Sequence, residues 1–145
     1  MTKSLESSIV RIYDPTCNNV VGAGFFSKTG LVLTCAHVVE AALGIGHSVE
    51  IPNGTVQLDF PLVAPGQRLT ARIVFWNPVN PNVFGEDIAG LKLETPLPDA
   101  AQPARLVSSK NLSNHPFSVF GFPHGREDGA WAYGKIKDIT ANGWL

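Results

Sequence analysis

The feature that most constrains this chain is a series of short, strand-like segments separated at near-regular intervals by turn-forming residues. Each segment is rich in Val, Ile, Leu or Phe, and Gly, Pro or Asn punctuates the series. The segments span residues 9–13, 20–27, 31–34, 48–51, 55–60, 69–76 and 87–93. Short strands at this spacing predict an all-β fold, and seven of them in succession suggest a small closed barrel.

The composition supports the same expectation. Hydrophobic residues make up 44% of the chain and charged residues 16%, with 14 Gly and 11 Pro, which favours many short elements and tight turns over a helical bundle. Only residues 37–43 have a helical composition, and Gly44 is placed to end that helix. We therefore expect one short helix, directly after the third strand.

A proline-rich stretch divides the chain. Residues 95–104 include Pro96, Pro98 and Pro103, which cannot donate ladder hydrogen bonds or continue a helix. We interpret the chain as three parts, a first barrel, a linker and the start of a second barrel, at residues 1–96, 97–116 and 117–145.

The last part has room for few strands, which we expect at residues 118–122 and 131–139. A sheet this small leaves apolar edges open and is only marginally stable. We therefore interpret the sequence as a piece of a longer protein.

Charge and hydropathy exclude several kinds of partner. The formal net charge is -1, and no stretch concentrates Lys and Arg, which argues against nucleic acid and anionic membranes as partners. Residues 1–8 are polar and lack the apolar run of a signal peptide, and no later stretch approaches the roughly 18 apolar residues of a membrane-spanning helix. We expect a cytoplasmic protein.

The thiols and imidazoles do not predict a metal site. Cys17 and Cys35 are expected to stay reduced, because disulfides seldom persist in a reducing compartment. No Cys-x-x-Cys or His-x-x-x-His spacing occurs among these cysteines and the histidines, so no zinc and no cofactor is expected. The histidines are His37, His47, His115 and His124.

The sharpest motif surrounds His37. Residues 21–27 read Val-Gly-Ala-Gly-Phe-Phe-Ser, and residues 30–39 read Gly-Leu-Val-Leu-Thr-Cys-Ala-His-Val-Val. The two glycines of the first stretch remove side chains where another strand must cross closely, and the hairpin then delivers His37 to the start of the short helix. Imidazole titrates near neutral pH, as a general base for a hydroxyl or thiol must. The alternative is a structural histidine at a helix start.

These two stretches resemble the trypsin-like serine proteases of the chymotrypsin fold, especially the bacterial branch related to HtrA. In that branch a Gly-x-Gly-Phe strand leads into a Thr-x-Ala-His turn. The resemblance implies a trypsin-like antiparallel β-barrel, the first barrel complete and the second only begun, with His37 as the catalytic histidine. It also implies a polypeptide substrate.

A second stretch of the chain extends the resemblance. Residues 87–93, Asp-Ile-Ala-Gly-Leu-Lys-Leu, resemble the family's Asp-Ile-Ala-Leu-Leu strand and begin fifty positions after His37. The resemblance implies that Asp87 is the catalytic aspartate, which accepts the other imidazole N–H and fixes its tautomer. The alternative is a surface carboxylate at the start of a strand. Gly90 departs from the bulky aliphatic residue usual in the family.

The third catalytic group is missing. The family places a Gly-x-Ser-Gly motif in the second barrel, and this sequence contains no Ser-Gly pair. Four serines follow Asp87 without such flanks: Ser108, Ser109, Ser113 and Ser118. The nucleophile, the oxyanion hole and the specificity pocket would then lie in a missing C-terminal half. The chain alone is expected to be inactive, although its family is that of serine-type endopeptidases.

A cysteine nucleophile in that missing half, as in the viral-type proteases of the same fold, is the alternative to serine. Cys35 is excluded as the nucleophile because we expect its side chain to be buried and to point away from His37. Residues 119–125, Val-Phe-Gly-Phe-Pro-His-Gly, resemble the family's Gly-Tyr-Pro turn, which makes His124 a turn residue.

Two further inferences concern control and function. No basic cleavage site precedes Ile9, so activation by N-terminal trimming is not expected. The second functional hypothesis is a protease-like domain without a nucleophile, which serves as a binding or scaffold module of a multidomain bacterial signalling or defence protein.

Overall fold

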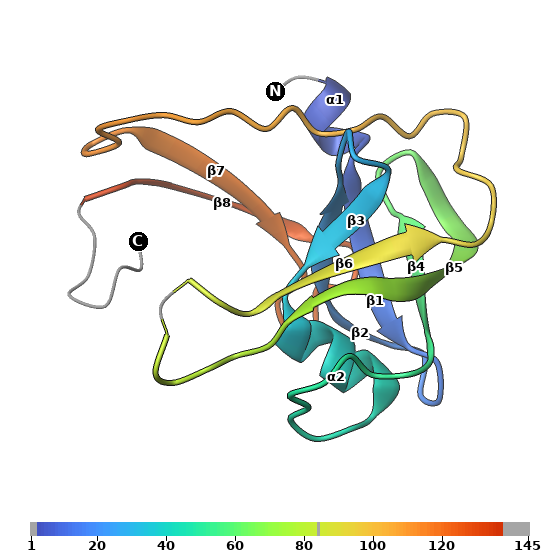
Figure 1. Cartoon of the computed structure of the whole chain (residues 1–145). Coiled ribbons are helices and arrows are strands. Elements are labelled where there is room, and N and C mark those ends of the chain that lie inside the picture. Colours follow the sequence, from blue (N-terminus) through green and yellow to red (C-terminus); the bar gives the residue numbers. More distant parts are fainter. Residues whose placement is uncertain (1–2, 84, 138–145) are drawn as a thin grey trace.

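The computed structural model describes residues 3–83 and 85–137, which form a closed barrel with a two-stranded sheet beside it (Figure 1). Neighbouring strands of the barrel run antiparallel in the order β1-β2-β3-β6-β5-β4, and β4 pairs with β1 to close it. The barrel strands are β1 (Ile9–Asp14), β2 (Asn19–Phe26), β3 (Leu31–Thr34), β4 (Thr55–Phe60), β5 (Ala64–Asn77) and β6 (Ile88–Leu93). The predicted all-β fold and first barrel are confirmed.

The barrel has six strands because the strand predicted at residues 48–51 does not form. Side chains take up both backbone polar groups of Ser48: its N–H donates to the Glu40 carboxylate at 2.8 Å, and its carbonyl accepts the Trp76 indole N–H at 3.1 Å. The backbone groups of Ser48 therefore need no strand partner. The strand predicted at residues 69–76 is longer than expected, since β5 begins at Ala64.

The predicted helix is confirmed as α2 (Ala36–Leu43), which follows β3 almost directly. Gly44 ends it in the left-handed conformation, with φ of 66°, and its N–H donates to the Ala41 carbonyl. Buried residues of α2 face one end of the barrel, and the short helix α1 (Lys3–Glu6), which the sequence did not predict, lies at the opposite end (Figure 1). No helix within the described residues has the length and hydropathy that crossing a membrane requires.

The hydrophobic core fills the inside of the barrel. Its largest fully buried side chains come from four of the strands and from α2, and each contributes about 1.5–3 kcal/mol through burial. They are Val10, Ile12, Val32, Val39, Val56, Leu58, Phe60 and Leu91. This core keeps the strand ends, where the candidate catalytic residues lie, in fixed positions.

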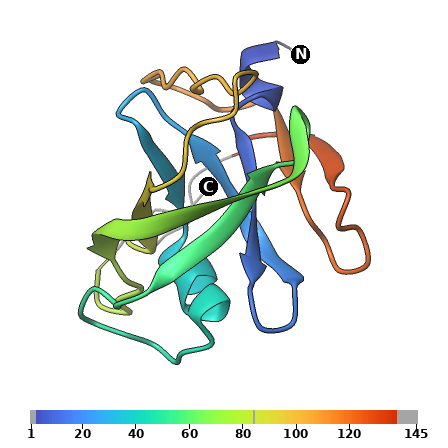
Figure 2. The ribbon, with the colours of Figure 1, turned by 90° about the vertical axis from the view of Figure 1, so that its right-hand side faces the viewer.

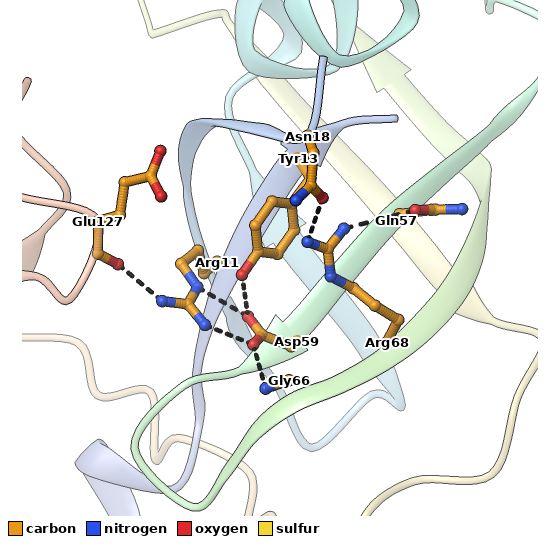
Figure 3. Close-up of polar contacts among 8 residues, drawn as sticks. All are labelled: Arg11, Tyr13, Asn18, Gln57, Asp59, Gly66, Arg68 and Glu127. Carbon is orange, nitrogen blue, oxygen red and sulfur yellow. Dashed lines mark hydrogen bonds and ion pairs between the residues drawn. The ribbon is translucent and has the colours of Figure 1, made fainter. Parts of the chain in front are cut away.

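A carboxylate is also buried, on the outer face of the barrel wall opposite to the core residues Leu58 and Phe60. Asp59 on β4 is fully buried, and it accepts hydrogen bonds from the Arg11 guanidinium, the Tyr13 hydroxyl and the Gly66 N–H (Figure 3). The hydrogen bond with Asp59 raises the pKa of Arg11. Because burial of an unpaired charge is costly, these hydrogen bonds offset the cost of burying the carboxylate.

The second sheet consists of β7 (Pro116–Gly121) and β8 (Ala130–Lys135), close to the strands predicted at residues 118–122 and 131–139. Residues 138–139 of that prediction lie outside the described part of the chain. Arg11 contacts the loop between these strands, since its Nη1 donates to the Glu127 carbonyl at 2.7 Å (Figure 3). The sheet is thereby held against the barrel.

The segment between β6 and β7 contains no strand, as its prolines predicted, but it is attached to the barrel. Ala104 forms a parallel bridge with Ser27, and its N–H donates to the Phe26 carbonyl at 2.8 Å. The Gln102 N–H donates to the Ser7 carbonyl at 3.1 Å. Figure 2 shows the segment crossing the end of the barrel that carries α1.

Candidate active site

His37 is held at the start of α2 by the strand before it and the strand beneath it. Thr34, the last residue of β3, donates its hydroxyl to the Ala23 carbonyl on β2 at 2.8 Å. The first turn of α2 lies so close to β2 that a Cβ at Gly22 would be 2.6 Å from Val38 Cγ1. Gly22 thus makes room for a side chain of α2, not for the crossing strand expected from the sequence, whereas at Gly24 the near neighbour is the Leu33 carbonyl of β3. His37 has a fixed backbone position.

Asp87 immediately precedes β6, and the register of the sheet brings it to His37. Strands β3 and β6 are antiparallel neighbours in which Thr34 pairs with Ala89, so the end of β3 and the start of β6 meet at one rim of the barrel. Asp87 has a φ of 85°, and its N–H donates to the Asn77 carbonyl at 3.0 Å. Aspartate tolerates this left-handed conformation better than most residues, and such strain concentrates at functional sites.

Two hydrogen bonds join His37 and Asp87. Nδ1 of His37 lies 2.6 Å from Oδ2 of Asp87, and the backbone N–H of His37 donates to Oδ1 at 3.0 Å. A carboxylate can only accept hydrogen bonds, so the neutral imidazole carries its proton on Nδ1 and has a lone pair on Nε2. The His37 side chain is 61% exposed and that of Asp87 17%, which leaves the ring accessible from solvent. The predicted contact is present.

The prediction that the Cys35 side chain points away is wrong. Its sulfur lies within 4.8 Å of both a His37 ring nitrogen and an Asp87 carboxylate oxygen. Cys35 has an extended backbone, with φ of -80° and ψ of 145°, and follows the buried Thr34. Because side chains alternate along an extended chain, Cys35 faces the other side, toward the rim. Strand alternation was the signal that could have predicted this placement.

The environment of Cys35 keeps its thiol protonated. Burial raises the pKa of the Cys35 thiol, and the nearby negative charge of Asp87 raises it further. A protonated thiol is a weak nucleophile. The raised pKa, and not the direction of the side chain, therefore argues against Cys35 as a thiolate nucleophile.

A cavity of about 470 Å³ lies between the barrel and the second sheet. The barrel contributes Phe25, Leu33 and Asp87 to its lining, and the second sheet contributes Phe120 and Trp131. The two aromatic rings of the second sheet pack edge to face, with centroids 5.0 Å apart. The cavity is thus largely apolar and has the Asp87 carboxylate at its edge.

The serines considered from the sequence are placed differently from one another. Ser118 lies on β7 and lines the same cavity as Asp87. Ser108, Ser109 and Ser113 are exposed in the segment before β7, where Ser113 donates its hydroxyl to the Lys137 carbonyl. None of these four serines lies in a Gly-x-Ser-Gly motif, so none is assigned as the nucleophile.

The remaining histidines lie elsewhere. Nδ1 of His47 is 3.3 Å from the Glu40 carboxylate, Nδ1 of His115 is 3.1 Å from the Pro116 carbonyl, and His124 is exposed in the turn after β7. Within residues 3–83 and 85–137, the group of His, Cys, Asp or Glu side chains close enough to share a metal ion is Cys35, His37 and Asp87. Spacing along the sequence did not reveal this group, because the fold assembles it.

Gly90 stands where the family usually has a bulky aliphatic residue, and neighbouring side chains fill the space beside it. A Cβ at Gly90 would lie 3.0 Å from Phe75 Cβ and 3.4 Å from Leu31 Cδ1. The two side chains from β5 and β3 thus occupy the space that a larger residue on β6 would need. The glycine leaves the Asp87 end of β6 unaffected.

Comparison with known proteins gives one family and a common fold. A family profile described as "Trypsin-like peptidase domain" matches residues 22–144. A search of curated protein sequences gives no match.

Three solved structures share the fold. HL collagenase matches with a TM-score of 0.65 and 18% identity over 95% of this chain and 61% of its own. Neuropsin, a serine protease expressed in the limbic system of mouse brain, matches with a TM-score of 0.60 and 14% identity. The match covers 95% of this chain and 63% of neuropsin. The Rv3671c protein from M. tuberculosis H37Rv, in the inactive form of a serine-to-alanine mutant, matches with a TM-score of 0.57 and 24% identity. The match covers 93% of this chain and 55% of that protein. The chain thus spans 55% to 63% of the length of these proteins.

Proposed function

This chain belongs to the trypsin-like peptidase domain family, and from that premise we propose that it is the part of a serine endopeptidase that carries the catalytic histidine and aspartate. His37 acts first as general base and then as general acid, and Asp87 orients it. The observation that carries this proposal is the 2.6 Å contact between His37 Nδ1 and Asp87 Oδ2.

The geometry of this contact supports the assigned roles. The backbone N–H of His37 engages Oδ1 of Asp87, which fixes the carboxylate while Oδ2 accepts the proton on Nδ1. Nε2 is then free to take a proton from a nucleophile. The imidazolium that forms is stabilised by the adjacent carboxylate. In well-studied triads, loss of the oriented carboxylate costs about 10⁴ in kcat.

The nucleophile and the oxyanion hole are assigned to sequence beyond the residues given. This sequence has no Ser-Gly pair, and the family's nucleophile serine precedes a glycine. We therefore expect the chain to be inactive by itself and the longer protein to hydrolyse peptide bonds in polypeptides. The division into residues 1–96, 97–116 and 117–145, a bacterial source and a cytoplasmic location are parts of the same proposal.

A serine-reactive fluorophosphonate probe tests the proposal on the longer protein. The probe reacts only with a serine that a base activates, so we expect labelling of the unmodified protein and a loss of about 10³-fold or more in His37→Ala. His47→Ala is the matched control, because His47 lies apart from Asp87 and pairs with Glu40. Equal labelling of the His37→Ala and unmodified proteins would reject the assigned role of His37.

The absence of a nucleophile motif favours one other candidate function. A protease-like domain without a nucleophile can retain the fold and serve as a binding or scaffold module. The sequence that follows in the longer protein separates the two functions. A Gly-x-Ser-Gly motif there supports the peptidase, whereas a substituted serine together with no probe labelling supports the binding module.

A further inference from the structure

The rim of the barrel brings together three different metal-ligand types. The Cys35 sulfur, a ring nitrogen of His37 and a carboxylate oxygen of Asp87 all lie within 4.8 Å of one another. Sulfur, imidazole nitrogen and carboxylate oxygen are the donors that zinc takes from proteins, and three protein ligands with an open fourth position are common in zinc sites. Aspartate and histidine alone would not distinguish such a site from a hydrogen-bonded pair, but the thiol adds a soft ligand.

We propose that Cys35, His37 and Asp87 bind one Zn²⁺ ion, with a water molecule as the fourth ligand. The ring nitrogen that faces the carboxylate is Nδ1, 2.6 Å from Oδ2. In a tetrahedral zinc site, with bonds of about 2.0–2.3 Å, the donor atoms lie about 3.3–3.7 Å apart. The Nδ1–Oδ2 contact therefore opens by about 1 Å, and the sulfur, which lies within 4.8 Å of the other two donors, adjusts to the same separation.

The local structure allows these small movements. The His37 side chain is 61% exposed, so its ring can shift without disturbing the core. Oδ1 of Asp87 stays bonded to the backbone N–H of His37, which leaves Oδ2 available to the ion. The thiol releases its proton to solvent, and the imidazole proton moves from Nδ1 through solvent to Nε2, so both donor atoms become available to the ion and one proton is released in total.

The metal-bound form has a consequence that rests on the proposed function. With Nδ1 bound to the ion, the neutral imidazole carries its proton on Nε2 and has no lone pair there. His37 then cannot accept a proton from a nucleophile, and Asp87 no longer receives the Nδ1 proton. Zinc occupation and general-base catalysis therefore exclude each other at this rim.

Titration of this chain with Co²⁺, under reducing and metal-free conditions, tests the binding without any need for activity. Cobalt adopts zinc-like geometry, and a bound thiolate produces a charge-transfer absorption band in the near ultraviolet. We expect one equivalent of Co²⁺ to produce this band and Zn²⁺ to abolish it by displacement.

Variants assign the ligands. Cys35→Ser should abolish the band and weaken binding by more than about tenfold, the lower end of what loss of even an outer hydrogen-bond partner costs. Cys17→Ser is the matched control, since Cys17 is the exposed free thiol and should leave the band unchanged. Asp87→Asn and His37→Ala should weaken Co²⁺ binding, and His47→Ala should not.

Alkylation provides a readout on the unmodified chain if a variant fails to fold. Zn²⁺ should slow the reaction of Cys35 with iodoacetamide, measured by mass spectrometry, and leave the reaction of Cys17 unchanged. A missing thiolate band with the unmodified chain, or a band that persists in Cys35→Ser, overturns the zinc proposal. Because these measurements need no nucleophile, they stand even if the peptidase proposal fails.

Discussion

Arg11 on β1 and Asp59 on β4, forty-eight residues apart, form a two-point ion pair on the outer face of the barrel wall, with Nε donating to Oδ1 at 2.9 Å and Nη2 donating to Oδ2 (Figure 3). The remaining guanidinium nitrogen, Nη1, reaches the Glu127 carbonyl in the second sheet's loop. The Arg11 side chain therefore links the outer face of the barrel wall to the loop of the second sheet.

Asp59→Ala should lower the free energy of unfolding by about 3–5 kcal/mol, the usual cost of removing one partner of a buried ion pair. The loss arises because the Arg11 guanidinium and the Tyr13 hydroxyl are left without their acceptor. Urea denaturation followed by circular dichroism measures it. Asp59→Asn retains the shape and one acceptor oxygen and should lose less. A stability unchanged in Asp59→Ala would contradict this view of the network.

Arg11→Lys should loosen the loop between β7 and β8. A single ammonium group cannot engage both the Asp59 carboxylate and the Glu127 carbonyl as the forked guanidinium does. We expect the amides of Arg126 and Gly129 to exchange hydrogen about fivefold faster, the effect of losing one net hydrogen bond of about 1 kcal/mol. Hydrogen exchange by NMR measures this, and the Gly44 amide at the end of α2 is the internal control. Uniform acceleration at all three amides would indicate global destabilisation instead.

Gly22→Ala should be destabilising by about 1–3 kcal/mol, since its Cβ would meet the Val38 side chain at 2.6 Å. Shortening Val38 to alanine in the same chain should recover part of this loss, with a coupling energy of about 0.5–3 kcal/mol. Gly24→Ala is the matched comparison, because its Cβ would meet the Leu33 backbone carbonyl at 2.6 Å, which cannot be shortened. Chemical denaturation of the single and double variants provides the energies. Simple additivity for Gly22→Ala with Val38→Ala would refute the proposed contact.

Asp14 should stay ionised to unusually low pH. Hydrogen bonds from the Thr16 hydroxyl and, to a smaller extent, Cys17 and the Thr16 N–H lower its pKa from 3.8 to about 2. A folded-state pKa below the unfolded one means that the contribution of Asp14 to stability is complete above pH 3.8 and is lost as pH falls through about 2. Carboxyl ¹³C NMR titration measures the value. Thr16→Val should raise the pKa, whereas Thr16→Ser, which keeps the hydroxyl, should not.

The sequence was sufficient to predict the barrel because it depends on local patterns, whereas the contact between His37 and Asp87, fifty residues apart, was predictable only through the resemblance to trypsin-like proteases. Short apolar segments with turns between them specify strands, and the fold of the family that the two motifs resemble implied that they meet at one rim. The turn at Gly44 was predictable for the same reason, since a glycine after an apolar helical segment is a local signal.

Features that depend on distant partners were not predictable in this way. Residues 48–51 have the composition of a strand, but Glu40 and Trp76 take the backbone hydrogen bonds of Ser48. The pairing of Arg11 with Asp59 has no signal in either local sequence. The direction of the Cys35 side chain follows from the alternation along the extended chain after the buried Thr34, and not from its burial.

The left-handed backbone at Asp87 has an evolutionary consequence. Asparagine is among the few residues that adopt this conformation readily, and aspartate codons become asparagine codons through a single base change. Such a mutation keeps the loop and removes the negative charge that His37 contacts. One point mutation therefore replaces the carboxylate beside His37 with an amide and leaves the barrel intact. By this single change, descendants of this gene can lose catalysis and keep a folded domain that binds peptides.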